Sequence, residues 1–135
     1  MTQLNAGQQE LIGLAENAAG QSYSPYSNFA VGSAVRWADG SVTTGTNVEN
    51  LSYGLTVCAE RNAVFSGAGQ GQRKIEAVAV WVKAEQLANP CGACLQVLSE
   101  FGDGETEVVL GGKGQPPQLK QLKEFLPNPF EADLA

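Results

Sequence analysis

The hydrophobic residues of the 135-residue chain follow two different periods, which separate predicted helices from predicted strands. Within residues 7–19, Leu11, Ile12 and Ala15 recur at helical spacing, whereas residues 75–82 (IEAVAVWV) form the short apolar run of a buried strand. The predicted elements, in chain order, are helix 7–19, strands 30–38 and 41–50, helix 57–66, strand 75–82, a helix that opens at PCGAC (90–94) and runs to about Phe101, strand 106–112 and helix 119–126.

Turn signals and the order of these elements predict the fold. The Asp39-Gly40 pair joins the first two strands as a hairpin, and the later alternation of strands and helices implies parallel pairs with right-handed crossovers. We therefore expect an α/β fold in three layers (α/β/α), with a mixed five-stranded sheet that begins with an antiparallel hairpin. The length fits a single domain over residues 1–135, with loosely ordered ends at 1–6 and 131–135.

Charge and composition narrow the classes of partner. The formal net charge is −6 and no cluster of Lys and Arg occurs, whereas nucleic-acid binding needs positive surface to offset phosphate. The chain lacks an apolar run of about 18 residues, the length of a membrane span, and its start lacks the pattern of a secretory signal. We expect a cytoplasmic protein that acts on a small molecule and binds neither nucleic acid nor membrane.

The absence of histidine restricts the chemistry of any catalytic site. A general acid or base must then be a carboxylate, Lys, Tyr or Cys, and a site for a soft metal must use thiolates. The chain has three cysteines, an odd number, which argues against a disulfide framework in a reducing compartment.

The three cysteines stand at the predicted starts of two helices. Cys91 and Cys94 are three positions apart at one start, and Cys58 stands at the other. Helix N-termini favour thiolates, and two helix starts that follow neighbouring strands can converge at one sheet edge. A CxxC pair alone also fits a redox disulfide or small core side chains, whereas three thiolates with an open fourth position are the pattern of a catalytic zinc site. Glu60 is then interpreted as lying beside the metal and not on it.

Five stretches carry a family pattern in register: SPYSNFAVG (24–32), TNVENLSYG (46–54), CAER (58–61), PCGAC.QV (90–97) and LPNPF (126–130). Together they resemble the homotetrameric cytidine deaminases, small nucleoside enzymes with a three-cysteine zinc site. The combination of C-A-E with P-C-x-x-C is itself a zinc-deaminase signature. The resemblance implies the cytidine-deaminase-like fold and one zinc ion held by Cys58, Cys91 and Cys94. It also implies hydrolytic deamination of cytidine or 2′-deoxycytidine in pyrimidine nucleoside salvage. The resemblance covers roughly residues 7–130.

The resemblance also implies roles for individual residues. Glu60 would shuttle protons between water and N3 of the pyrimidine, and Arg61 would donate hydrogen bonds to the thiolates. Asn47 and Glu49 would hold the ribose hydroxyls, and the Glu49 carboxylate would repel a phosphate, which favours a nucleoside over a nucleotide. The remaining implied contacts are Phe29 against the base, Ala59, and Tyr53 and Phe130 reaching the site of a neighbouring subunit, hence a homotetramer with shared active sites.

Four of these side chains have a simpler structural interpretation. Arg61 can form a surface ion pair, Asn47 can serve a turn, Glu49 can be solvated and Phe29 can belong to the core. The chain also departs from the family pattern, with Leu95 where Arg is common, Asn89 where Ser is common and Ala30 where Pro is common.

Other functions fit parts of the pattern. A blasticidin-S deaminase shares the cysteine motifs but lacks the N-x-E-N stretch before them, so this stretch favours cytidine. A free-base deaminase would use a histidine in the first motif, and a structural zinc module would need four ligands. A thioredoxin-like protein would leave Cys58 unexplained, and a nucleic-acid cytosine deaminase would need basic surface.

Overall fold

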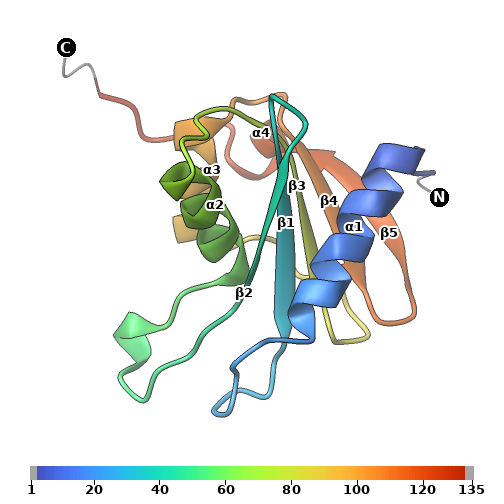
Figure 1. The fold of residues 1–135 in the computed structure, drawn as a ribbon, viewed down its shortest axis with the longest axis vertical. Coiled ribbons are helices and arrows are strands. Elements are labelled where there is room, and N and C mark those ends of the chain that lie inside the picture. The colour runs from blue at the N-terminus through green and yellow to red at the C-terminus, as the bar shows by residue number, and fades with distance from the viewer. Residues whose placement is uncertain (1–2, 133–135) are drawn as a thin grey trace.

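The computed structural model describes residues 3–132 of the chain, arranged around one central sheet (Figure 1). Within these residues, no helix combines the length and the apolar character needed to cross a membrane. The elements are α1 (Ala6–Ala19), β1 (Val31–Trp37), β2 (Val42–Thr46), the 3-10 helix η1 (Tyr53–Leu55), α2 (Ala59–Gly69), β3 (Ile75–Val82), α3 (Gly92–Phe101), β4 (Glu107–Gly112), β5 (Gln115–Gln121) and α4 (Leu122–Phe125).

The five strands form one mixed sheet in the order β2-β1-β3-β4-β5. β1 pairs antiparallel with both β2 and β3, β3 and β4 run parallel across the α3 crossover, and β4 pairs antiparallel with β5. The predicted mixed sheet with its leading hairpin is therefore confirmed. Because β2, β3 and β4 run in the same direction, their carboxyl ends lie at one edge of the sheet, the usual place for a binding site in α/β folds.

The two faces of the sheet carry side chains of different size, since successive residues of a strand point to opposite faces. The face under α1 is lined by small residues such as Ala34, Ala77 and Ala79. A Cβ atom on Gly32 would lie 1.9 Å from the carbonyl oxygen of Ala15, so α1 contacts the strand backbone directly. The opposite face packs larger residues against α2 and α3, among them Val35, Trp37, Val64, Val78, Val80, Leu95 and Leu98. Figure 1 shows α1 on one side of the sheet and α2 with α3 on the other.

The prediction for residues 119–126 is wrong in part, because the segment starts in strand β5 and only α4 is helical. Leu119 packs in the cluster beneath α1 and Leu122 in the cluster on the opposite face, so their helix-like spacing serves two separate cores. β5 begins before this segment and contains Pro116 and Pro117, and it is an edge strand, where a missing N–H is tolerated.

The start of the chain is better ordered than expected. Leu4 is buried, and Asn5 caps α1 through a reciprocal capping box with Gln8. The expected looseness of residues 1–6 therefore does not hold at Leu4 and Asn5. The parts of that prediction at residues 1–2 and 133–135 lie outside the described residues.

Candidate metal centre and substrate cavity

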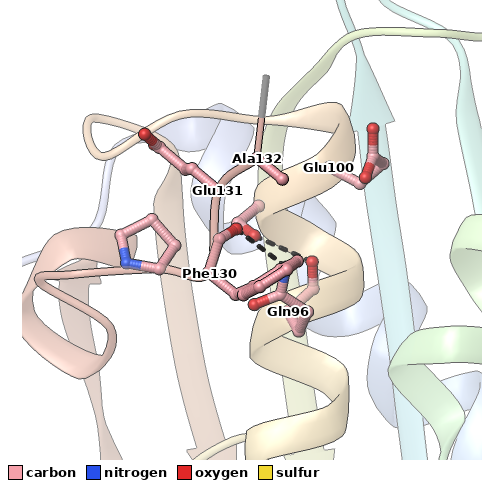
Figure 2. Close-up of a pocket in the computed structure, with 7 residues that line it drawn as sticks. Gln96, Glu100, Phe130, Glu131 and Ala132 are labelled. Carbon is pink, nitrogen blue, oxygen red and sulfur yellow. Dashed lines mark hydrogen bonds between the residues drawn. The ribbon is translucent and has the colours of Figure 1, made fainter. Parts of the chain in front are cut away.

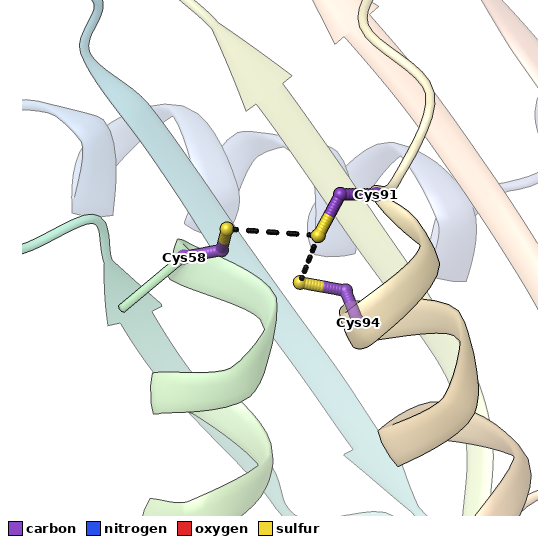
Figure 3. A group of neighbouring side chains, drawn as sticks. All are labelled: Cys58, Cys91 and Cys94. Carbon is purple, nitrogen blue, oxygen red and sulfur yellow. Dashed lines mark hydrogen bonds between the residues drawn. The ribbon is translucent and has the colours of Figure 1, made fainter. Parts of the chain in front are cut away.

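Three thiols gather at one point of the structure, as Figure 3 shows. The Sγ atoms of Cys58 and Cys91 are 3.8 Å apart, those of Cys91 and Cys94 are 3.4 Å apart, and all three lie within 4.8 Å of one another. A tetrahedral zinc ion with Zn–S bonds of about 2.3 Å separates its sulfur ligands by about 3.8 Å. A disulfide would need about 2.0 Å, so the three cysteines are free and their spacing fits one zinc ion.

The local fold explains why the sulfurs converge. Cys58 is the N-cap residue of α2, Cys91 is the N-cap residue of α3, and Cys94 lies one turn inside α3. Neither N-cap sulfur accepts a capping hydrogen bond from the backbone of its own helix, and the two sulfurs face each other in front of two helix N-termini. The partial positive charge of those termini stabilises thiolates, as the sequence predicted.

Arg61 adds a full positive charge to this cluster. Its Nη2 atom donates a hydrogen bond to the Cys58 Sγ at 3.5 Å, which fits the predicted contact with a thiolate. The pKa of Cys58 falls to about 5, chiefly because its thiolate accepts a hydrogen bond from the Cys94 thiol, with a further contribution from Arg61. The same hydrogen bond and burial raise the pKa of Cys94.

Glu60 occupies the first turn of α2 and is 5% exposed. Burial raises the pKa of its carboxyl to about 7, and the negative charge of Cys58 acts in the same direction. A carboxyl group that titrates near neutrality can both take up and release a proton, which suits a general acid and base.

A cavity of about 180 Å³ opens between these groups and the carboxyl edge of the sheet. Cys58, Cys91 and Glu60 form the wall on the metal side. The other lining residues are Phe29, Val31, Asn47, Thr56, Ala59, Val80, Ala88 and Asn89. The predicted site residues Phe29, Asn47 and Ala59 thus join the cysteines. Four other lining residues were not singled out from the sequence: Val31, which lies inside the SPYSNFAVG motif, and Thr56, Val80 and Ala88, which lie outside the quoted motifs.

Asn47 and Glu49 face two adjoining cavities. Asn47 is 8% exposed; its Oδ1 accepts hydrogen bonds from Val31 N and the Ser22 hydroxyl, and its Nδ2 donates to the Phe29 carbonyl at 2.7 Å. Among the described residues, these bonds leave one Nδ2 hydrogen for a ligand.

Glu49 instead lines a second cavity of about 290 Å³ with Tyr26, Ser27, Tyr53 and Thr56. Its carboxylate accepts hydrogen bonds from the N–H groups of Tyr26 and Ser27 and from the Ser27 hydroxyl. The Ser27 hydroxyl is the main cause of a lowered pKa at Glu49. Thr56 lines both cavities, so the two adjoin at this residue.

Tyr53 and Phe130 lie outside the metal cavity of their own chain. Tyr53 is 73% exposed, and its ring meets the Tyr26 ring edge to face, with the centroids 6.1 Å apart. Phe130 is 77% exposed and lies on the tail that crosses α3, where its carbonyl accepts a hydrogen bond from Gln96 Nε2 at 3.3 Å (Figure 2). A cavity of about 520 Å³ lies between α3 and the tail near Phe130. No cysteine lines it, so this larger cavity is not the metal site.

The structure places the three residues that depart from the family pattern, Leu95, Asn89 and Ala30. Leu95 is 7% exposed in the core beneath α3, so an apolar contact stands where the family often has a charge. Asn89 lines the metal cavity, and Ala30 lies beside the loop that presents Phe29.

The fold has three layers (α/β/α), and three free thiols at two helix N-termini lie beside a buried carboxyl. These features define a class of zinc-binding proteins with an acid–base group at the metal. Residues 6–111 match the family described as the cytidine and deoxycytidylate deaminase zinc-binding region. The chain belongs to this family.

Individual relatives agree with this assignment. A cytidine deaminase of Halalkalibacterium halodurans is 44% identical over 125 residues, which are 93% of this chain and 95% of the relative. One from Mycobacterium tuberculosis is 42% identical over 123 residues, which are 91% of this chain and 89% of the relative. The crystal structure of the cytidine deaminase from Burkholderia pseudomallei superposes with a TM-score of 0.87 at 41% identity and covers 94% of this chain and 100% of that one.

Proposed function

We propose that this chain hydrolyses cytidine and 2′-deoxycytidine to the uridine nucleosides and ammonia, in the cytoplasm and for pyrimidine salvage. The observation that carries the proposal is the gathering of three sulfurs, at the spacing of zinc ligands, beside the nearly buried carboxyl of Glu60. Cys58, Cys91 and Cys94 would hold one zinc ion. When bound, zinc supplies Lewis acidity that brings the pKa of water into the neutral range.

The proton transfers fall to Glu60. Water adds to C4 of the pyrimidine while one of its protons passes through the carboxylate to N3. A second proton, from the new hydroxyl group on C4, passes through the carboxylate to the amino group. The C4–N bond then breaks as the C4=O bond forms, and ammonia leaves. Glu60 suits both steps because burial raises its pKa to about 7. Among the described residues that line the cavity, Glu60 is the only carboxylic acid.

The two adjoining cavities suit the two halves of a nucleoside. The smaller one holds the base against Phe29, near Cys58 and Cys91, and the larger one holds the sugar near Glu49. The free Nδ2 hydrogen of Asn47 and the carboxylate of Glu49 can bind ribose hydroxyls. Glu49 would repel a 5′-phosphate, which favours nucleosides over nucleotides.

A substrate panel tests this proposal on the zinc-loaded protein. Cytidine and 2′-deoxycytidine should lose absorbance with release of ammonia, while cytosine, CMP and blasticidin S should react far more slowly. Zinc content is measured on the same sample, and we expect about one ion per chain. Zinc without turnover of cytidine would refute the proposal, and preferential turnover of blasticidin S would support the alternative deaminase.

We also propose that the chain forms a homotetramer whose subunits share active sites. The support is a set of large apolar side chains on loops near the cavity and on the tail, which a single chain leaves uncovered. These are Tyr23, Tyr26, Val48, Leu51, Tyr53, Leu55 and Phe130, each between 42% and 79% exposed.

A mixing experiment tests the shared sites. Glu60→Gln subunits and Phe130→Ala subunits, each weakly active alone, are co-assembled and assayed with cytidine. In a shared arrangement, some sites regain a normal Glu60 and a normal Phe130, so activity exceeds the sum of the separate samples. Strict additivity, or a fully active monomer by light scattering, would contradict the shared sites.

A further inference from the structure

A short contact joins the start of α2 to the end of β2. The Asn62 side chain donates a hydrogen bond from Nδ2 to the carbonyl oxygen of Thr46 at 2.8 Å. The backbone N–H of Asn62 donates to the Cys58 carbonyl at 3.2 Å. One residue therefore links the metal side of the site to the last residue of β2, and the next residue along the chain is Asn47.

The packing around this bond leaves little freedom. A Cβ atom on Gly45 would lie 2.4 Å from the Ala63 nitrogen and 2.6 Å from the Ala59 carbonyl oxygen, so the first turn of α2 lies directly on β2. The buried Thr43 hydroxyl donates to the Ala63 carbonyl at 2.8 Å and fixes the same turn further along the strand. The bond from Asn62 reaches the residue that directly precedes Asn47, which lines the cavity.

Two walls of the cavity depend on this junction. Glu60 comes from α2, and Asn47 follows β2, so the distance between them is set by how α2 sits on β2. Asn62 follows Glu60 by two positions along the chain. Its hydrogen-bond acceptor, Thr46, directly precedes Asn47.

We propose that Asn62 is a positioning residue that aligns Glu60 with the sugar-binding side of the site. The inference rests on the proposed function, because it assumes that Asn47 anchors the sugar while Glu60 serves the base. A nucleoside held by its hydroxyls presents C4 and N3 to Glu60 correctly only if this spacing is kept. A misplacement of about 1 Å at such a site lowers the rate by about a hundredfold.

The test is the variant Asn62→Asp, which keeps the size of the side chain but replaces the donor by an oxygen that repels the Thr46 carbonyl. It is compared with Asn62→Gln, which keeps a donor, and with Asn17→Asp, the same change on the exposed surface of α1. Each zinc-loaded variant is assayed with cytidine and with 2′,3′-dideoxycytidine, which lacks the hydroxyls that the sugar-binding side would hold. Where its turnover is too slow, dideoxycytidine is measured as a competitive inhibitor.

In Asn62→Asp we expect kcat/KM for cytidine to fall at least about tenfold while zinc content is kept, with much of the loss in kcat. The kcat/KM for dideoxycytidine should change by less than about twofold, because without the hydroxyl contacts its base can bind independently of the sugar-binding side. Asn62→Gln should recover part of the activity, and Asn17→Asp should match the wild type.

Equal losses for both substrates would overturn the proposal, as would unchanged kinetics or a loss of zinc, since these outcomes assign Asn62 a purely structural role or none. If Asn62→Asp fails to fold, the ratio of the two substrates in Asn62→Gln decides, and a ratio equal to that of the wild type overturns the proposal. A wild type that does not deaminate cytidine would refute the proposed function itself, which is a separate result.

Discussion

Replacement of Gly45 by alanine should disable the metal site from a distance. The added Cβ would lie 2.4 Å from the Ala63 nitrogen, 2.6 Å from the Ala59 carbonyl oxygen and 2.8 Å from the Asn62 carbonyl carbon. All three are backbone atoms of α2, so no side chain can rotate away. Ordinary contact distances begin near 3.4 Å, and α2 must therefore retreat from β2 by about 1 Å.

That displacement is large for the groups which α2 carries. Metal–ligand distances tolerate about 0.2 Å, and a misplacement of 1 Å in a catalytic group costs about a hundredfold in rate. Overpacking also lowers the free energy of unfolding by about 1–3 kcal/mol. We expect Gly45→Ala to bind zinc poorly, because Cys58 moves, and to lose at least about a hundredfold in kcat/KM for cytidine, because Glu60 moves too.

Gly13→Ala is the matched control. Gly13 lies inside α1, and a Cβ atom there would have no neighbour within 4 Å. The substitution should raise the free energy of unfolding by about 0.5–1 kcal/mol, because glycine is unfavourable inside a helix, and leave turnover unchanged.

Both variants are measured for zinc content, cytidine turnover and thermal unfolding. Full zinc content, a normal kcat/KM and an unchanged melting temperature in Gly45→Ala would contradict the predicted displacement of α2. Failure of Gly13→Ala to keep its activity would show that the assay responds to any added methyl group and not to the contact with α2.

Three further changes test other parts of the site and fold. Glu60→Gln should keep zinc but lose turnover by at least about 10²–10⁴-fold, and near-normal deamination of cytidine by this variant would contradict its proton-transfer role. Arg61→Gln should weaken zinc retention by about 10–100-fold in competition with a chelator, because Cys58 loses its charged hydrogen-bond donor; unchanged retention would count against this. Hydrogen bonds from Gln72 and Ser41 hold the pKa of Asp39 at about 2, below its ordinary value of 3.8, so they stabilise the hairpin above about pH 4 and lose this effect as the pH falls towards 2. Asp39→Asn should therefore lower the free energy of unfolding at pH 7 more than at pH 2, and equal effects at both would be evidence against the linkage.

The sequence predicted most of the chemistry because the chemistry depends on residue types that few other roles require. Cys58, Cys91 and Cys94 signalled a metal site by their spacing and by their places at two helix starts, and the structure brings them together. Glu60 followed from its place beside Cys58 and from the absence of histidine. The central strand 75–82 was predicted to the residue, since a strand buried on both faces reads as one apolar run.

The remaining features depend on pairings that no local pattern encodes. β5 has two prolines and few apolar residues, and only its place at the sheet edge makes it a strand. The link from Asn62 to Thr46 joins residues 16 positions apart, and neither residue type signals it. The predicted strand 41–50 would place Asn47 and Glu49 on one face, but β2 ends at Thr46, and the two residues line different cavities.

Because Cys58 and Cys91 cap separate helices, a bound ion would also cross-link α2 to α3. It would tie together two points of the backbone that are 33 residues apart, with β3 in between. An ion that binds the gathered ligands of the folded site more tightly than it binds the unfolded chain stabilises the folded state by linkage. Removal of the ion would therefore weaken the whole domain, so a chelator would act as a mild denaturant besides abolishing catalysis.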